Sequence, residues 1–215
     1  MKFNKEMLIL YGITDRSPAK EKSLYEQIGD ALKGGVTMLQ LREKDLNPED
    51  FLKEAKEVKK LCEKFGVPLI INDNLDVALK SGADGVHVGS EDLPVSEIRK
   101  IVPENFIIGA TAKTVEQAKK AEESGADYIG VGAVFPSPTK KNAIRITVDQ
   151  LNEICSSVLI PAVAIGGIGI HNLDELKNGK MKGVALVSAI FSAEDIVKTT
   201  ALLKEKVRNI ILKGE

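Results

Sequence analysis

The chain has 215 residues and a formal net charge of −1, from 30 basic and 31 acidic side chains. This length is typical of one large domain, and α/β barrels reach it undivided. Because the charge is balanced, nothing attracts nucleic acid or an acidic membrane to the chain as a whole, and neither is an expected partner.

Short apolar runs alternate with amphipathic segments along the whole sequence, and eight of the runs are expected to be buried strands. They cover residues 8–14, 38–42, 69–72, 85–88, 107–111, 128–131, 162–165 and 184–187. Near-continuous apolar strands separated by helices are typical of a parallel sheet covered on its faces. Eight such units predict an α/β fold, a single-domain (β/α)8 TIM barrel over residues 1–215, rather than an open doubly wound sheet.

Capping patterns mark the starts of several helices between these strands. Asn47 offers an N-cap side chain before Pro48 and two first-turn acids. Apolar residues then recur at helical spacing, which predicts one face packed on the barrel. They are Phe51, Leu52, Ala55, Val58, Cys62 and Phe65. The segments that begin at Thr114 and Thr147 each have glutamine three residues later, which fits a capping box.

Two similar segments, 81–85 and 124–128, each join a predicted helix to the next strand. The glycine in each suits a left-handed helix C-cap. Asp84 and Asp127 follow at the N-terminal ends of strands, where residues of a barrel usually serve stability. We therefore interpret both aspartates as structural.

Two aspartates follow neighbouring predicted strands. Asn72 and Asp73 end the run that begins at Val67, and Asp92 lies just past the run 85–88. Parallel strands of a barrel end at one mouth, where two carboxylates can bind a divalent cation and the cation can bind a phosphate. Each acid alone is equally well explained as a helix cap or a first-turn acid. Together they predict a Mg²⁺ site, since Mg²⁺ takes one or two carboxylates and completes its shell with water and phosphate.

The second predicted strand ends in an amide and two cations on alternate positions: Gln40, Arg42 and Lys44. Alternate side chains share one side of a strand, so a side that faces the barrel would bury these groups together. Such burial is costly without an anion, and the planar fork of arginine suits phosphate oxygens. The alternative is a surface ion-pair ladder with Glu43 and Asp45.

Hydroxyl groups and cations follow the fifth and sixth predicted strands. The hydroxyl of Thr111 can donate to a phosphate, or can simply precede the helix cap at Thr114. Residues 135–142 combine two prolines with hydroxyls and cations, among them Thr139 and Lys140. A loop of this kind can close over a phosphorylated ligand and exclude water, or can be a solvated connection.

The last two predicted strands lead into a glycine-rich turn and a short segment. Gly166 and Gly167 follow strand seven and expose backbone N–H groups, and Val187 and Ser188 follow strand eight. The second segment can begin a short helix whose N-terminus points inward. This pair of loops is the recurrent monophosphate site of such barrels.

No covalent nucleophile is evident in the sequence. His87 lies inside a predicted strand, so we expect a packed, hydrogen-bonded histidine rather than a catalytic one. The chain has no G-x-S-x-G elbow, no H-E-x-x-H and no Walker lysine. Cys62 and Cys155 match neither a zinc-binding nor a redox spacing and are expected to be buried thiols. With no signal peptide and no apolar run long enough to span a bilayer, we expect a cytoplasmic protein that makes no use of a membrane.

Taken in order, these motifs resemble those of a known family, thiamine phosphate synthase, over nearly the whole chain from Tyr11 to Ser188. The specific parts are Gln40-x-Arg42-x-Lys44, Ile71-Asn72-Asp73, Gly85-Val86-His87-x-Gly89-x-x-Asp92, Tyr128-Ile129-Gly130-x-Gly132, Thr139-Lys140 and Ile165-Gly166-Gly167-Ile168. Several separate motifs in the family's order make the resemblance specific.

The resemblance implies a transferase of thiamine biosynthesis. In the family, 4-amino-5-hydroxymethyl-2-methylpyrimidine diphosphate loses pyrophosphate, and the ring nitrogen of 4-methyl-5-(2-phosphoethyl)thiazole captures the pyrimidine methylene to give thiamine phosphate. A thiazole phosphate that also carries a carboxylate is a second candidate acceptor. The carbon–oxygen bond breaks first, leaving a pyrimidine cation that its own amino group stabilises. Such an enzyme must stabilise departing negative charge and needs no nucleophile of its own.

The resemblance also implies roles for individual residues. Asp73 and Asp92 correspond to the ligands of one Mg²⁺ per subunit. The expected pyrophosphate contacts are Arg42, Lys44, Asn72, Thr111 and Lys140, all but Asn72 also expected to be catalytic. Gln40 corresponds to a pyrimidine contact. The expected thiazole-phosphate side is Ser137, Thr139, Gly167, Val187 and Ser188.

Three positions depart from the family's usual pattern. Thr111 stands where serine is common and Ser137 where threonine is common, so both keep a hydroxyl group. Lys113 stands where histidine is frequent, which leaves the role of that position open.

Two other functions remain as alternatives, a thiazole tautomerase-like isomerase on the same fold and a non-catalytic sensor of a phosphate ligand. The isomerase need not keep the diphosphate-binding residues, and the sensor needs no metal-binding acids. The chain retains all of these residues: Arg42, Lys44, Asp73, Asp92 and Lys140. That favours the synthase. The sequence leaves the oligomeric state open, and a homodimer is compatible with it.

Overall fold

The computed structural model describes residues 2–16, 22–136 and 145–212. Eight parallel strands pair in chain order, and β8 pairs with β1 to close the barrel. The strands are β1 (Leu10–Ile13), β2 (Met38–Leu41), β3 (Leu69–Asn72), β4 (Gly85–Val88), β5 (Ile107–Ala112), β6 (Tyr128–Val131), β7 (Ala162–Ile165) and β8 (Gly183–Leu186). The predicted (β/α)8 barrel is therefore confirmed.

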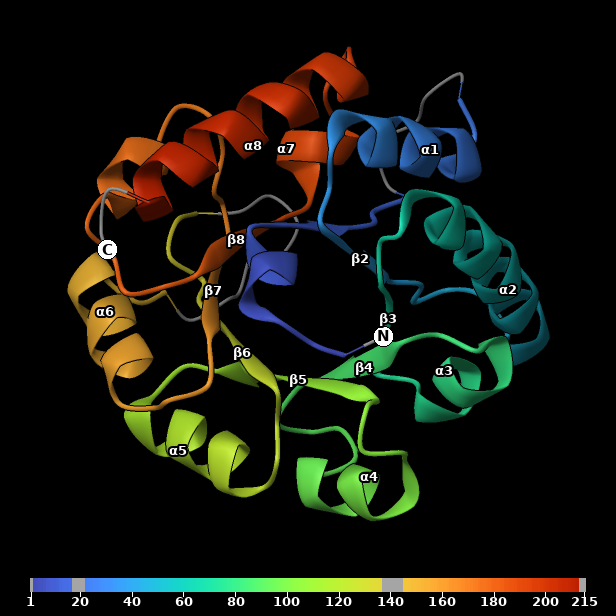
Figure 1. Cartoon of the computed structure of the whole chain (residues 1–215), viewed down its shortest axis with the longest axis horizontal. Coiled ribbons are helices and arrows are strands. Elements are labelled where there is room, and N and C mark those ends of the chain that lie inside the picture. The colour runs from blue at the N-terminus through green and yellow to red at the C-terminus, as the bar shows by residue number, and fades with distance from the viewer. Residues whose placement is uncertain (1, 17–21, 137–144, 213–215) are drawn as a thin grey trace.

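Helices form an outer ring around the strands (Figure 1). The α-helices are α1 (Leu24–Gly34), α2 (Pro48–Phe65), α3 (Leu75–Ser81), α4 (Val95–Ile101), α5 (Val115–Glu123), α6 (Val148–Ser156), α7 (Ser188–Phe191) and α8 (Ile196–Leu212). Two short 3-10 helices accompany them, η1 (Lys5–Leu8) and η2 (Leu173–Leu176). In the described part of the chain, no helix has both the length and the apolar character needed to cross a membrane.

The helix starts largely follow the predicted caps. The Asn47 side chain accepts from the backbone N–H groups of Glu49 and Asp50, at 3.1 and 3.0 Å. Thr147 forms the complete capping box with its glutamine. At Thr114 only half of the predicted box forms, because Gln117 accepts instead from the backbone N–H of Lys113, at 2.7 Å.

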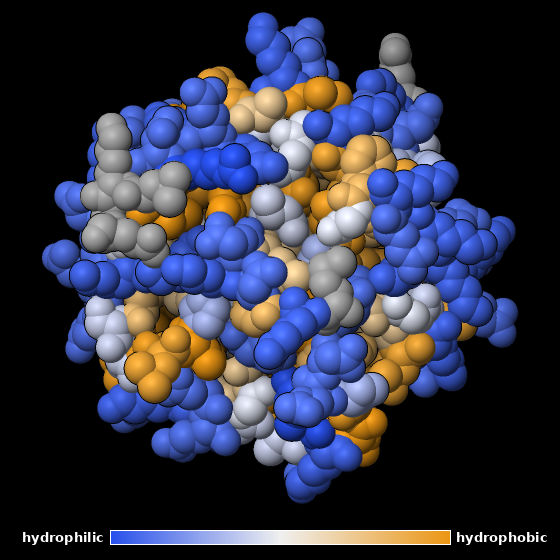
Figure 2. Space-filling view, in the orientation of Figure 1, coloured by the Kyte–Doolittle hydropathy of each residue, from blue (hydrophilic) through white to orange (hydrophobic). Residues whose placement is uncertain are grey.

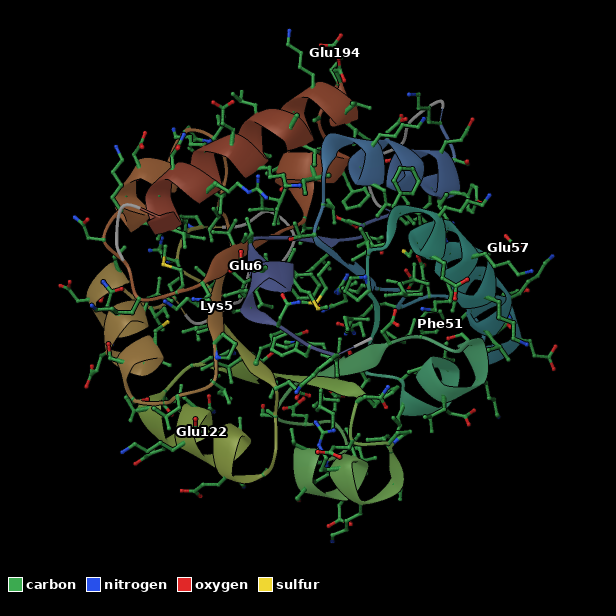
Figure 3. All side chains as sticks on the ribbon, in the orientation of Figure 1. Lys5, Glu6, Phe51, Glu57, Glu122 and Glu194 are labelled. Atoms are coloured by element: carbon green, nitrogen blue, oxygen red, sulfur yellow. The ribbon has the colours of Figure 1, made fainter. Side chains whose placement is uncertain are left out.

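One face of α2 packs on the barrel. Phe51 lies on the inner side of this helix and Glu57 on its outer side (Figure 3). Most of the predicted apolar face is buried or packs against the core, but Phe65 is 40% exposed, so its predicted burial is wrong. Phe65 is the last residue of α2, and the chain turns away at the left-handed Gly66 (φ 65°). Leu61, which the predicted face omitted, is buried instead.

Two apolar cores lie on the two sides of the sheet. One joins the outer helices to the strands, and the other fills the barrel interior. The interior cluster is Met7, Leu8, Tyr11, Ile13, Met38, Ile70, Ile107, Tyr128, Val163 and Ala185. Helix η1, with Lys5 and Glu6, lies across the middle of the strand ring (Figure 3). The backbone carbonyl of its Met7 accepts from the Thr37 hydroxyl, just before β2, so η1 closes the N-terminal end of the barrel. Hydrophilic side chains dominate this face (Figure 2).

The two aspartates of the repeated segments occupy equivalent places. Asp84 accepts from the backbone N–H of Leu69 at 2.8 Å and from Lys59 at 2.9 Å. Asp127 accepts from the backbone N–H of Ile108 at 2.7 Å and from Arg99 at 2.7 Å. Each carboxylate therefore ties the start of the preceding strand to a helix, as its interpretation as structural requires.

Candidate active site

The carboxyl ends of the strands surround a cavity of about 560 Å³. Seven of the predicted site residues line it: Gln40, Arg42, Asn72, Thr111, Gly167, Val187 and Ser188. Lys113, whose role the sequence left open, lines it as well. Ser137, Thr139 and Lys140 lie outside the described residues. The cavity lining combines apolar side chains with amide, hydroxyl and cationic groups, a combination suited to holding a heterocycle and a phosphate together.

The end of β2 places Gln40 and Arg42, but not the half-exposed Lys44, in the cavity lining that the alternation predicted. Gln40 and Arg42 both line the cavity. Lys44 reaches the neighbouring strand end, where its Nζ lies 3.6 Å from Asp73 Oδ2. Glu43 turns away and pairs with Arg16 at 3.1 Å. Lys44 and Glu43 thus have separate partners, which does not support the alternative ladder.

The two predicted metal ligands meet beside this lysine. Burial raises the pKa of the Asp73 carboxyl, and the facing carboxyl of Asp92 raises that pKa further, while Lys44 opposes both effects. Asp92 is held in place by the backbone N–H of Gly89, which donates to its Oδ2 at 2.7 Å. Asp73 itself has φ 61°, a left-handed conformation that few non-glycine residues adopt and that aspartate tolerates better than most. The backbone is therefore bent at the point where the carboxylate turns toward Asp92.

This acid pair fits Mg²⁺. Two facing carboxylates with one nearby lysine leave negative charge that a divalent cation would neutralise, and carboxylate oxygens are ligands that Mg²⁺ prefers. Among residues 2–16, 22–136 and 145–212, no group of three or more His, Cys, Asp or Glu could hold a metal ion. A cation at Asp73 and Asp92 would therefore draw its other ligands from water and from substrate oxygens, as Mg²⁺ commonly does.

The glycine-rich turn after β7 packs against the chain that leaves β6. Gly166 and Gly167 have φ 99° and 64°, which favours glycine. A Cβ on Gly167 would collide with the carbonyl oxygen of Pro136, and one on Gly166 would lie 2.5 Å from the Ala133 Cβ. Ser188 lines the cavity beside this turn and begins the short helix α7, as the sequence predicted.

Sequence reasoning missed Tyr11 as a lining residue. Its hydroxyl joins Gln40 to Tyr128. The Tyr11 hydroxyl oxygen lies 2.7 Å from Gln40 Nε2 and 2.8 Å from the Tyr128 hydroxyl oxygen. His87 lies between Tyr128 and Thr111, so the expected packed, hydrogen-bonded histidine is confirmed, but it also lines the cavity. The available signal was a tyrosine within a strand expected to be buried, because a buried hydroxyl needs a partner.

Comparisons with known proteins agree with this geometry. The family model described as thiamine monophosphate synthase matches residues 10–190. Thiamine-phosphate synthase 2 of Streptococcus pneumoniae is 46% identical over 209 residues, which cover 97% of this chain and 99% of the relative. The thiamine-phosphate synthase of Clostridium tetani is 44% identical over 189 residues, covering 88% and 90%. The solved structure of thiamine phosphate pyrophosphorylase from Pyrococcus furiosus superposes with a TM-score of 0.88 at 38% identity, covering 96% and 98%. The chain therefore belongs to the thiamine monophosphate synthase family.

Proposed function

We propose that the chain joins 4-amino-5-hydroxymethyl-2-methylpyrimidine diphosphate to 4-methyl-5-(2-phosphoethyl)thiazole and releases thiamine phosphate and pyrophosphate. It is a transferase of thiamine biosynthesis that acts on small molecules, as its family membership indicates. The observation that carries the specific reaction is the position of Arg42 and Thr111 in the cavity wall, beside the facing carboxyls of Asp73 and Asp92. A cation, a hydroxyl donor and two carboxyl groups that can bind a metal, all on one side of the barrel mouth, suit a leaving diphosphate.

The chemistry needs charge stabilisation rather than a protein nucleophile. The carbon–oxygen bond to the diphosphate breaks with its electron pair on oxygen, and the thiazole nitrogen then donates a pair to the pyrimidine methylene. We assign Arg42, Lys44 and Thr111 to the departing oxygens, together with Asn72. Fixed donors aimed at developing charge are often the largest single contribution to catalysis. Lys140 is proposed for the same role from its motif alone, because it lies outside the described residues.

Mg²⁺ is the proposed metal. Bound at Asp73 and Asp92, it would supply positive charge to the diphosphate and lower the cost of its departure. The protein's own part is to hold the two carboxylates together and to keep Lys44 against Asp73. That arrangement supports one ion per subunit.

The two heterocycles are proposed to occupy separate parts of the cavity wall. Gln40, at the end of β2, is assigned to the pyrimidine. Gly167, Val187 and Ser188 line the wall after β7 and β8, which only β1 separates from β2, and are assigned to the thiazole phosphate, with Ser137 and Thr139 proposed from their motif. Backbone N–H groups in a left-handed glycine turn form the kind of concavity that binds anions. The isomerase and sensor alternatives are not favoured, since the curated relatives at 44–46% identity are synthases.

The reaction can be tested directly. We expect the purified chain, given both substrates and Mg²⁺, to release equal amounts of pyrophosphate and thiamine phosphate. The thiazole phosphate with an additional carboxylate should be run in parallel, to identify the preferred acceptor. Arg42→Gln should lower kcat about 10²–10³-fold, as expected for one preorganised charge-stabilising donor. The matched control is Lys100→Gln, an exposed cation of α4 paired with Glu97, and it should leave the rate unchanged. If neither acceptor gave a product, the proposal would be refuted.

A further inference from the structure

Five side chains form an unbroken hydrogen-bonded chain across the barrel interior. They are Gln40, Tyr11, Tyr128, His87 and Thr111, from five different strands. The successive distances are 2.7 Å (Nε2 to OH), 2.8 Å (OH to OH), 3.1 Å (OH to Nδ1) and 3.0 Å (Nε2 to Oγ1). Gln40 and Thr111, the two ends of this hydrogen-bonded chain, line the cavity. Tyr128, in its middle, is fully buried and does not.

The orientation of the Gln40 amide is the basis for the direction that we assign to the other bonds. The amide nitrogen of Gln40 donates to the Tyr11 oxygen, and we assign the Tyr11 hydroxyl hydrogen to the Tyr128 oxygen so that it too has an acceptor. The Tyr128 hydrogen then goes to Nδ1 of His87. An imidazole that accepts at Nδ1 carries its hydrogen on Nε2, and His87 therefore donates to the Thr111 oxygen. In this arrangement the Thr111 hydroxyl hydrogen stays available for an acceptor in the cavity, which Thr111 lines.

The interior is shaped to hold this chain. A Cβ on Gly109 of β5 would collide with the ring and hydroxyl of Tyr128 and would lie 2.5 Å from His87 Nδ1. A Cβ on Gly130 of β6 would lie 3.3 Å from His87 Cε1. Phe3 stacks on the Tyr128 ring with a centroid distance of 5.8 Å. The two glycines therefore leave room for the Tyr128 and His87 side chains, and the Phe3 ring packs against Tyr128.

We propose that Tyr11, Tyr128 and His87 are positioning residues that fix the Thr111 hydroxyl as a hydrogen-bond donor toward the diphosphate. This inference rests on the proposed function, in which Thr111 contacts the leaving group and Gln40 the pyrimidine. A threonine hydroxyl otherwise rotates freely between donor and acceptor orientations. With its oxygen occupied by His87, the hydroxyl offers a donor whose direction is set before the carbon–oxygen bond breaks. Donors that need no reorientation are the ones that stabilise developing charge best.

A reversed chain is the alternative, and it makes the opposite prediction. If Gln40 presented its carbonyl oxygen to Tyr11, every bond would run the other way. His87 would then carry its hydrogen on Nδ1, and the Thr111 hydrogen would be used on His87 instead of on the diphosphate. The tautomer of His87 therefore reports the direction of the whole chain.

The experiment reads that tautomer and the rate separately. In ¹⁵N-labelled enzyme without substrate, we expect the long-range ¹H–¹⁵N pattern of a neutral imidazole protonated on Nε2 for His87. The chain has two histidines, and His171→Gln, at an exposed position, assigns the signals. Tyr128→Phe keeps the ring and removes the central hydroxyl. It should give a mixed tautomer and lower kcat about tenfold, with the KM for the thiazole phosphate unchanged, as expected for one misdirected hydrogen bond.

Tyr25→Phe is the matched control, because Tyr25 is the one of the sequence's three tyrosines outside the hydrogen-bonded chain and is 42% exposed on α1. It should change neither the tautomer nor kcat. If Tyr128→Phe does not fold, Tyr11→Phe breaks the same chain one bond earlier. An Nδ1–H tautomer in the unmodified enzyme, or an unchanged kcat in the folded variant, overturns the proposal. Because the tautomer is read without turnover, an enzyme that makes no thiamine phosphate would count against the proposed function instead.

Discussion

Lys44 lies 3.6 Å from the carboxylate of Asp73, and that carboxylate also faces Asp92. One half-exposed ammonium group therefore stands beside two carboxyl groups and can balance the charge of only one. Exposed pairs of this kind contribute little, and the facing acids repel each other when both are ionised. The unliganded protein is thus strained electrostatically at the place where a divalent cation is proposed to bind.

Asp73→Asn should separate stability from metal binding. Without metal, this variant should melt at a higher temperature than the unmodified enzyme, because the repulsion with Asp92 is removed. Asparagine also tolerates the left-handed backbone at this position. In the unmodified enzyme, Mg²⁺ at tenfold excess over its Kd should add about 1.4 kcal/mol, or roughly 3–6 °C in Tm. Thermal melts with EDTA and with Mg²⁺ measure both effects.

Asp92→Asn should behave in the same way, and Asp45→Asn supplies the control. Asp45 is an exposed acid one residue beyond Lys44. The Asp45→Asn variant should have the melting temperature of the unmodified enzyme and the same response to Mg²⁺. A full Mg²⁺-dependent rise in Tm in both site variants would show that the ion binds elsewhere.

Arg16 holds a second pair of facing acids, Glu43 just after β2 and Glu54 on α2. Its guanidinium lies 3.1 Å from Glu43 and 2.5 Å from Glu54. One oxygen of each carboxylate is buried without a hydrogen-bond partner. Burial raises the pKa of Glu43 and the facing Glu54 raises it further, while Arg16 lowers it. The two carboxylates remain together because the arginine bridges them.

Arg16→Gln should therefore destabilise the fold in a pH-dependent way. A carboxyl whose folded pKa is raised contributes stability below its unfolded pKa, about 4.3 for glutamate, and loses it as pH rises through the folded pKa. Removal of Arg16 raises that folded pKa further. We expect a Tm loss of about 2–4 °C at pH 8 and little loss at pH 4.5, where the pair can share a proton. Arg208→Gln, at an exposed position of α8, is the control. Equal losses at both pH values would contradict the role of Arg16.

The strands were predictable because burial imposes apolar, β-branched runs on a parallel barrel. The first strand shows where that signal ends. Residues 8–14 form one apolar run, but the strand begins only at Leu10, because Asn4 caps the short helix η1 through Leu8. Both segments are buried, so composition cannot separate them. The last strand was placed one residue late for a similar reason, since glycine at its start carries no apolar signal.

The site was predictable only where it depends on position along one strand. Alternation within β2 placed Gln40 and Arg42 on the same side, and both line the cavity. The bond between Tyr11 and Tyr128 joins residues 117 positions apart, and it depends on how strands face each other across the barrel. No spacing in the sequence encodes that relation. Residues 137–144, with three of the proposed contacts, lie outside the described structure, and their roles stay predictions.

Asp84 offers a test of stability away from the cavity. Its carboxylate accepts from the backbone N–H of Leu69 and from Lys59 at the opposite end of the barrel. Asp84→Ala should cost about 1–3 kcal/mol, because a partly buried amide and an ammonium lose their acceptor. Urea unfolding measures this change, and kcat in the folded variant should equal that of the unmodified enzyme. Asp127→Ala, in the equivalent place, should give a similar loss. A large fall in kcat without loss of stability would place Asp84 in the catalytic machinery instead.

Gly109 and Gly29 form a matched pair for the packing of the barrel interior. A Cβ at Gly109 would collide with Tyr128, whereas one at Gly29, on α1, meets nothing within 4 Å. Gly29→Ala should stabilise the fold by about 1 kcal/mol, since alanine favours a helix interior. Gly109→Ala should destabilise it by about 1–3 kcal/mol through overpacking. Because the collision falls on the hydroxyl that donates to His87, Gly109→Ala should also lower kcat, while Gly29→Ala should not. Denaturant titration and steady-state kinetics on both variants measure these effects, and equal behaviour of the two would mean that the interior accommodates a methyl group without moving Tyr128.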